Sequence, residues 1–125
     1  MKGLRGKVES GIGDFGGWIE KLEAHYERKT GVTLYPGTLN IRLEEPYTVP
    51  TGCARLEATE YGGSVSVNIV PCWILRRRAF ILRTDGNEGE KGRYPRTVVE
   101  IASDVKLRDE YHLVNGDEVF IEVED

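Results

Sequence analysis

The stretch "YPGTLNIRLEEP", residues 35–46, decides how the chain is to be interpreted. From Leu39 to Leu43, aliphatic residues at every second position alternate with polar ones, which is the period of a β-strand with one buried face. This alternation places Thr38 and Asn40 together on the other face, directly after a Pro-Gly turn. The pair either lies on the solvated face of a sheet or presents two neutral oxygen atoms to a ligand, and oxygen is the ligand that Mg²⁺ takes.

Length and composition indicate one domain, residues 1–125, with enough chain to bury a core without disulfides. No apolar run approaches the roughly 20 residues that span a bilayer, and no apolar segment follows the basic residues at the start. We therefore expect a cytoplasmic protein with no membrane partner, and a monomer by default. The net charge of −4 disfavours nucleic acid as a partner, because non-specific binding to phosphates needs positive charge.

The rest of the chain indicates one substantial α-helix and several short strands. Residues 17–31 carry an apolar and aromatic stripe at helical spacing, and Gly31 follows the stripe as a stop signal. The triplet Arg76–Arg78 separates two apolar segments and predicts a tight charged corner between strands. We predict a mainly β fold, either a barrel or a sandwich. Its strands are expected in residues 5–10, 38–44, 64–70, 72–75, 79–84, 96–103 and 115–125.

A glycine-rich loop, "SGIGDFGGW" at residues 10–18, connects the first predicted strand to the helix. Glycines let backbone N–H groups approach a ligand closely, and the start of a helix suits a phosphate. No Lys-Ser/Thr follows the last glycine, so this is not a Walker A loop, and its spacing is not that of a Rossmann fingerprint. Taken alone, the loop is either a phosphate-binding loop or a tight structural turn.

Two further places combine charge with apolar neighbours. Glu100 lies inside "TVVEIAS", where partial burial of its carboxylate would suit a general base; alternatively it faces solvent on an edge strand. Lys106 and Arg108 lie in "VKLRDEYHLVNGD", where they either contact phosphates or are simply solvated.

The order of these features along the chain resembles the archaeal CTP-dependent riboflavin kinase family. The stretches that carry the resemblance are "SGIGDFGG", "GTLNIRL" and "VEIASDVKLRDEYHLVNGDEV", and the resemblance extends over residues 7–123. It implies a small six-stranded β-barrel of the cradle-loop type. The implied reaction transfers a phosphoryl group from CTP to the 5′-hydroxyl of riboflavin, giving FMN and CDP, with Mg²⁺ bound.

The resemblance also implies roles for individual residues. Thr38 and Asn40 match the family's Mg²⁺ ligands, and Glu100 matches a flavin-site glutamate that we interpret as the candidate catalytic base. Thr97 is a candidate flavin contact. The nucleotide is expected to contact two segments, whose residues are Gly11, Ile12, Gly13, Asp14, Phe15 and Gly16 in the loop and Val105, Lys106, Leu107 and Arg108 further on.

The chain departs from the family pattern at two places. Phe15 stands where the family has a glycine, and Gly92 and Tyr94 stand where it has Thr and His ahead of the flavin-site glutamate. The two departures leave two classes of function open. One is a CTP-dependent riboflavin kinase; the other is a non-catalytic barrel that binds a nucleotide or metabolite as a sensor and has lost the flavin site.

Overall fold

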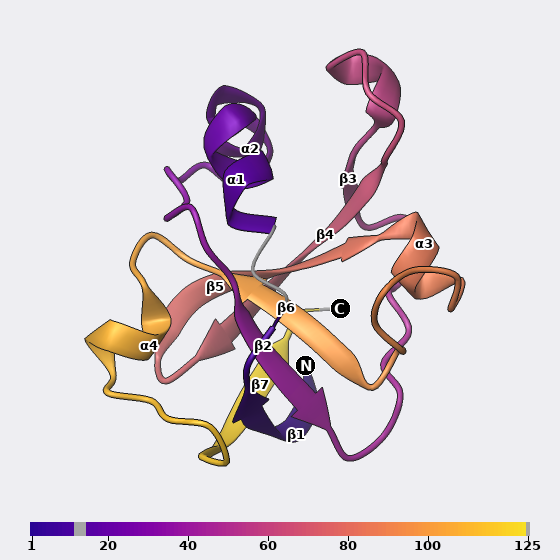
Figure 1. The fold of residues 1–125 in the computed structure, drawn as a ribbon. Helices are drawn as coiled ribbons and strands as arrows, with labels where there is room; N and C mark the ends of the chain where they lie inside the picture. Colours follow the sequence, from indigo (N-terminus) through magenta and orange to yellow (C-terminus); the bar gives the residue numbers. More distant parts are fainter. Residues whose placement is uncertain (12–14, 125) are drawn as a thin grey trace.

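The computed structural model describes residues 1–11 and 15–124, and these residues form a single sheet that curls into a barrel (Figure 1). Its strands are β1 (Lys2–Glu9), β2 (Leu39–Leu43), β3 (Ala54–Leu56), β4 (Val67–Ile74), β5 (Arg77–Thr84), β6 (Val98–Ala102) and β7 (Glu118–Val123). The helices are α1 (Phe15–Lys21), α2 (Glu23–Thr30), the one-turn η1 (Ala58–Glu60), α3 (Asp85–Glu88) and α4 (Leu107–Glu110).

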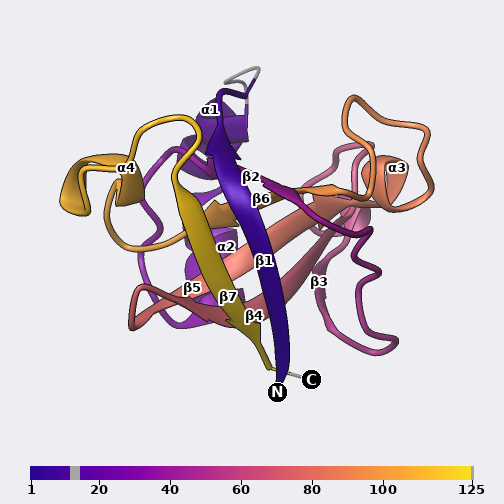
Figure 2. The same cartoon turned by 90° about the horizontal axis from the view of Figure 1, so that it is seen from below.

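Six of the strands close the barrel, and every pairing in it is antiparallel. The sheet order is β3-β4-β5-β6-β2-β1-β7, and an additional pairing of β4 with β7 joins the two sides. β3 pairs only with β4 and extends away from the closed barrel (Figure 2). The predicted mainly β, six-stranded barrel is therefore confirmed.

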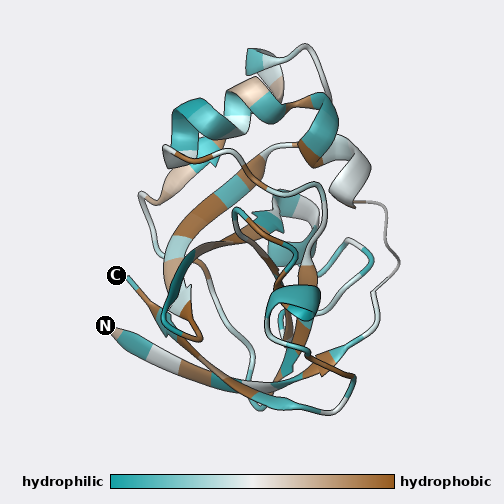
Figure 3. Cartoon of the chain, turned by 90° about the vertical axis from the view of Figure 1, so that its left-hand side faces the viewer, coloured by the Kyte–Doolittle hydropathy of each residue, from teal (hydrophilic) through white to brown (hydrophobic). Residues whose placement is uncertain are grey.

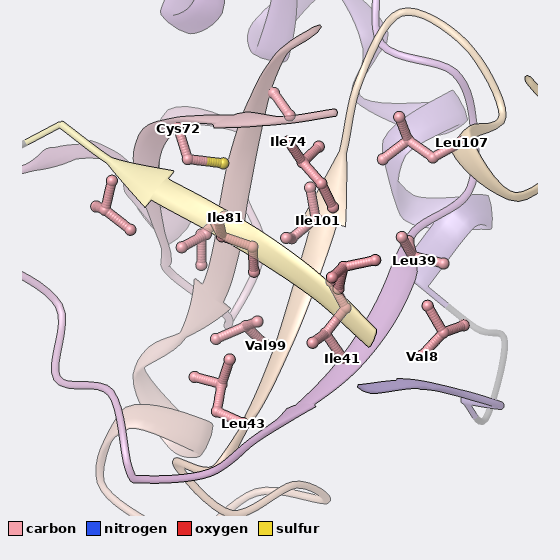
Figure 4. Packing of buried hydrophobic residues seen from close by; sticks show 14 of the residues in the cluster. Val8, Leu39, Ile41, Leu43, Cys72, Ile74, Ile81, Val99, Ile101 and Leu107 are labelled. Atoms are coloured by element: carbon pink, nitrogen blue, oxygen red, sulfur yellow. The ribbon is translucent and has the colours of Figure 1, made fainter. Parts of the chain in front are cut away.

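The barrel interior is filled by aliphatic side chains that alternate with outward-facing residues along each strand. Ile41, Ile81, Ile101 and Ile121 have no exposed surface and come from four different strands. Figure 4 shows several of these side chains converging from β2, β5 and β6. Closure of the sheet thus buries one face of the strands, and Leu107 of α4 adds to the same core.

A second apolar cluster lies outside the barrel, under α1 and α2. Ile19 and Tyr26 from the helices pack there with residues such as Ile69 and Leu82 from the outer face of β4 and β5. Because this face is covered by helices, β4 and β5 are buried on both sides. Figure 3 shows hydrophobic residues on these strands beneath the helical layer.

The single predicted helix is divided in the structure. α1 and α2 follow one another, and Leu22 between them leaves the helical conformation, with φ −107° and ψ 26°. The amide of Leu22 still donates to Trp18, and the amide of Tyr26 donates to Leu22, so the apolar stripe continues across the break. As predicted, Gly31 ends the helix in the left-handed conformation.

The predicted strands at 64–70 and 72–75 form one strand, β4, which begins only at Val67. Val65 lies outside it and is about half exposed. The two segments look separate in the sequence because both faces of β4 are buried: Val67 and Ile69 pack under the helices on the outer face, whereas Val70 and Cys72 fill the barrel interior. The charged corner is confirmed as a tight turn in which Leu75 and Arg76 adopt left-handed φ angles of 52° and 65°.

The two ends of the chain lie side by side (Figure 2). Lys2 of β1 pairs with Val123 of β7 in the antiparallel register. In the part of the chain that is described, no helix is long and apolar enough to cross a membrane.

Truncation of one side chain in the barrel interior tests whether this interior is closely packed. Replacing the fully buried Ile121 by Ala should lower the free energy of unfolding by about 2–5 kcal/mol, because it leaves a cavity in the barrel interior. Glu122→Ala, on the exposed face of the same strand, is the matched control and should change stability by less than about 0.5 kcal/mol. Urea denaturation of both variants measures the difference; equal effects would contradict the closed interior.

Candidate active site

The site is built around a row of residues that crosses the outer face of the sheet. Asn40 of β2 is the direct partner of Glu100 in β6, and Glu100 in turn is the partner of Leu82 in β5. Leu82 belongs to the helix-covered cluster, whereas Asn40 and Glu100 are polar and still less than 10% exposed. Glu100 therefore lies at the border where the apolar cover ends, in a position that places a carboxylate in a largely buried setting.

Thr38 and Glu100 are joined directly. The Thr38 hydroxyl donates a hydrogen bond of 2.9 Å to Oε2 of Glu100. Thr38 precedes the first residue of β2, and Asn40 follows two residues later, so both lie on the side of the strand that faces Glu100. The prediction that Thr38 and Asn40 share a face is borne out, and the solvated strand face is not, because Asn40 is buried.

A large cavity of about 630 Å³ opens on one side of Glu100. Most of its wall is aromatic or apolar, with Phe15, Trp18, Leu22 and Tyr26 coming from α1, α2 and the turn between them. Such a size and lining are typical of a pocket for a small organic ligand. Across from the helices, the wall is formed by residues 61 and 63–67 and by residues 84–87 and 92–94.

A much smaller cavity, about 70 Å³, lies beside Thr38. Its lining includes the four residues Val105–Arg108 that were predicted to contact a nucleotide, together with Tyr35, Gly37 and Leu39. Because Thr38 lines the small cavity and Glu100 lines the large one, their hydrogen bond connects the two. A group bound in either cavity would approach the same pair of side chains.

The glycine-rich loop begins beside Asn40. Gly11 lies against the side chain of Asn40, so close that a Cβ atom on Gly11 would be 2.5 Å from Oδ1. The predicted nucleotide contacts Ile12, Gly13 and Asp14 lie outside the described residues. Gly11 nevertheless shows that the loop starts beside the proposed metal ligands.

The other two predicted loop residues take different positions. Gly16 belongs to α1 and lies against the backbone of Pro36, since a Cβ atom there would be 2.5 Å from the carbonyl oxygen. It thereby allows the helix to approach the turn that precedes Thr38. Phe15 lines the large cavity, while Val105–Arg108 line the small one.

In the second predicted nucleotide segment, the side chains have distinct surroundings. Leu107 is buried in the barrel core, and Lys106 is exposed with its ammonium 3.7 Å from Asp109. The guanidinium of Arg108 donates to the carbonyl oxygen of Glu9 at 3.4 Å, which joins α4 to the end of β1 just ahead of the glycine loop. Val105 is half-buried against the barrel core.

Thr97, like Gly11, Gly16 and Asn40, is not among the residues that line either cavity. Thr97 lies three residues before Glu100, and because side chains alternate along a strand, this odd offset does not favour the face of Glu100. Its carbonyl oxygen accepts a hydrogen bond from the amide of Leu43. Gly92 and Tyr94, which replace the family's Thr and His, do line the large cavity.

Sequence reasoning missed the aromatic wall. Trp18 and Tyr26 belong to the apolar and aromatic stripe of residues 17–31, from which the sequence predicts a helix and no ligand contact. Half of the Trp18 side chain is exposed, which is unusual for a residue on such a stripe. Tyr61 completes the wall, and its hydroxyl donates to the carbonyl oxygen of Val65.

The charges at the large cavity are set by specific neighbours. Burial raises the pKa of the Tyr26 phenol, and the nearby phenol of Tyr61 and carboxylate of Glu100 raise it further, so Tyr26 stays protonated at neutral pH. Hydrogen bonds from Arg55, at 2.8 and 2.9 Å, lower the pKa of Asp85. Asp85 is thus an ionised, already paired carboxylate at the cavity wall.

The residues at Thr38 could complete the coordination of a hard cation but could not form a closed site. The described residues contain no cluster of three or more His, Cys, Asp or Glu side chains suited to a metal ion. Asn40 is buried, and its side-chain nitrogen has no hydrogen-bond partner among the residues that the structure describes. Two neutral oxygens fit an ion such as Mg²⁺ when phosphate oxygens supply the remaining ligands.

The model of one protein family, CTP-dep_RFKase, described as "Domain of unknown function DUF120", matches residues 8–123. The chain belongs to this family. The resemblance found in the sequence is therefore confirmed over nearly the whole barrel.

Several relatives are named riboflavin kinase. The protein of that name from Methanocella arvoryzae is 34% identical over 127 residues, a match that covers 97% of this chain and 56% of the relative. That of Pyrobaculum aerophilum is 34% identical over 134 residues, covering 96% and 60%. That of Methanosphaera stadtmanae is 31% identical over 134 residues and is covered over 99% of both chains. The chain thus spans little more than half the length of the first two relatives and almost all of the third.

Two neighbouring glycines of α1 give a matched test of how closely this helix approaches the turn that precedes Thr38. Gly17→Ala should raise the free energy of unfolding by up to about 1 kcal/mol, because no atom of the described residues lies within 4 Å of the new Cβ and alanine favours the helix. Gly16→Ala should instead lower it, because its Cβ would collide with the Pro36 carbonyl. Thermal unfolding of the two variants checks the opposite signs; a stabilising Gly16→Ala would contradict the close approach.

Proposed function

We propose that the chain is a CTP-dependent riboflavin kinase, which transfers the γ-phosphoryl group of CTP to the 5′-hydroxyl of riboflavin. The observation that carries this proposal is the hydrogen bond between Thr38 and Glu100, which connects two cavities of different character. A transferase needs donor and acceptor to meet at one point, and this pair is the point that both cavities share. Membership of the family and the names of the relatives support the same reaction.

On the donor side, the phosphates of CTP would lie near Thr38, between the glycine loop and residues 105–108. Gly11 removes the Cβ atom that would otherwise fill the space beside Asn40. Lys106 is exposed, so its ammonium group is accessible to a phosphate. Thr38 and Asn40 would hold Mg²⁺ through their side-chain oxygens. When bound, the ion would neutralise charge on the transferred phosphate and help to orient it.

On the acceptor side, the isoalloxazine ring would occupy the large cavity. Its volume of about 630 Å³ and its aromatic wall suit a flat, largely apolar ring. Glu100 lies where the ribityl chain would have to end for its 5′-hydroxyl to meet the donor. This arrangement assigns recognition of the ring to the helices and placement of the reacting hydroxyl to the barrel.

In the reaction, a bond forms between the ribityl 5′ oxygen and the γ-phosphorus, while the bond from that phosphorus to the β,γ-bridging oxygen breaks. The proton of the 5′-hydroxyl passes to the Glu100 carboxylate, and CDP leaves with the bridging oxygen. Most of the catalysis would come from positioning and charge neutralisation, as is usual for phosphoryl transfer.

The second candidate function, a sensor that binds a nucleotide or metabolite without catalysis, has one observation in its favour. Thr97 does not line the large cavity, and Gly92 and Tyr94 replace the polar residues that the family has ahead of Glu100. A sensor would retain nucleotide binding and yield no FMN.

A product assay separates the two functions. The purified protein is incubated with riboflavin, Mg²⁺ and either CTP or ATP, and FMN and the nucleoside diphosphate are quantified by chromatography. We expect equal amounts of FMN and CDP with CTP and little FMN with ATP. Binding of CTP without FMN formation would instead establish the sensor.

Replacement of Thr38 tests its role as a ligand of the metal and phosphates. Thr38→Val keeps the shape of the side chain and removes the hydroxyl, and turnover should fall by roughly 100-fold or more. Thr38→Ser retains the hydroxyl and serves as the control, with turnover within about a few-fold of the original. If both variants turn over like the original protein, Thr38 is not a ligand.

Replacement of Glu100 by Gln tests the proposed base. The amide has nearly the same shape and still accepts a hydrogen bond from Thr38, but it cannot take a proton, so turnover should fall roughly 100- to 10,000-fold. Affinity for riboflavin, measured by quenching of flavin fluorescence, should change much less. An unchanged turnover would remove Glu100 from the chemistry.

A further inference from the structure

The side chain of Tyr26, on α2, is buried together with its hydroxyl. The side chain is 1% exposed, and its oxygen has no hydrogen-bond partner in the described part of the chain. Buried hydroxyls in native proteins nearly always have one, because an unpaired one costs stability. A tyrosine retained here instead of phenylalanine therefore calls for a functional reason.

The place of Tyr26 supplies that reason. The residue lines the large cavity, and the Glu100 carboxylate lies close enough to raise the pKa of its phenol. Glu100 itself contacts Thr38 at the small cavity. Tyr26 thus lines the same cavity as Glu100, the residue through which the two cavities are connected and which the reacting part of an acceptor must reach.

We propose that the Tyr26 hydroxyl donates a hydrogen bond to a hydroxyl oxygen of the ribityl chain, and so is a specificity-determining residue of the acceptor site. The inference rests on the proposed kinase function. The protonated phenol is a donor at neutral pH, and a polyol chain offers acceptor oxygens where the flat ring offers only its edge. Ligand binding then satisfies the hydroxyl that folding leaves unpaired.

A second tyrosine offers a matched control. Tyr47 is 2% exposed, and its hydroxyl likewise has no partner in the described residues. It packs in the barrel core and is not among the residues that line the large or the small cavity. Tyr26 and Tyr47 thus share the stability cost of a buried hydroxyl, and only Tyr26 can meet a ligand.

The experiment compares Tyr26→Phe and Tyr47→Phe in two measurements. Without ligand, both variants should melt a few degrees higher than the original protein, since each loses an unpaired buried hydroxyl. The dissociation constant for riboflavin should rise roughly 3- to 10-fold in Tyr26→Phe, because this is the usual effect of losing one hydrogen bond between neutral groups. It should stay unchanged in Tyr47→Phe.

Lumichrome, which has the ring without the ribityl chain, tests whether the Tyr26 hydroxyl donates its hydrogen bond to the ribityl chain or to the ring. Its dissociation constant should be the same for the original protein and Tyr26→Phe. An equal loss for riboflavin and lumichrome would overturn the ribityl assignment, and a lower melting temperature of Tyr26→Phe would show that the hydroxyl already has a partner and overturn the premise.

The two proposals fail in different ways. Equal riboflavin affinity in the original protein and Tyr26→Phe, with FMN still formed, overturns only the role of Tyr26. If the original protein neither binds riboflavin nor forms FMN, the kinase function and the role of Tyr26 are both overturned.

Discussion

The antiparallel pairing of β2 with β6 is the constraint on which the site depends. It sends Ile41 and Ile101 into the barrel and places Asn40 opposite Glu100 on the outer face. A slip of one residue would exchange the faces and move polar groups into the interior, where an unpaired carboxylate is very costly. The packing that stabilises the barrel therefore also holds the site in register, and the apolar side chains fix the positions of the polar ones.

The helices also determine the surroundings of the Glu100 carboxylate. Outside the barrel, α1 and α2 cover Ile69 and Leu82, and Glu100 lies between Leu82 of this apolar cluster and the polar Asn40. This explains why one side chain can line an aromatic cavity and still contact Thr38. The same place holds the buried side-chain nitrogen of Asn40, which has no hydrogen-bond partner among the described residues, as is common where a protein gives up stability for function.

The sequence predicted much of the barrel because alternation along β2 and β7 marks the apolar face that fills the interior. It was wrong about β4, where the helical cover buries both faces and the alternation no longer marks inside and outside. The helix was found from its stripe, but the break at Leu22 has no sequence signal, since neither glycine nor proline is present there. Thr38, Asn40 and Glu100 were found together through the resemblance. The aromatic wall was not found, because an exposed face of Trp18 becomes apparent only when its neighbours are in place.

The pairing of Lys2 with Val123 brings both chain ends to one point of the barrel. From there β1 runs to Glu9 beside Asn40, a path of roughly 20–25 Å at the usual rise of a strand. A fusion partner, affinity tag or surface linker attached at either end would thus be joined far from Thr38 and Glu100. For the same reason, a short peptide joining the two ends would allow circular permutation, with new ends opened at the turn of Leu75 and Arg76 and both cavities left intact.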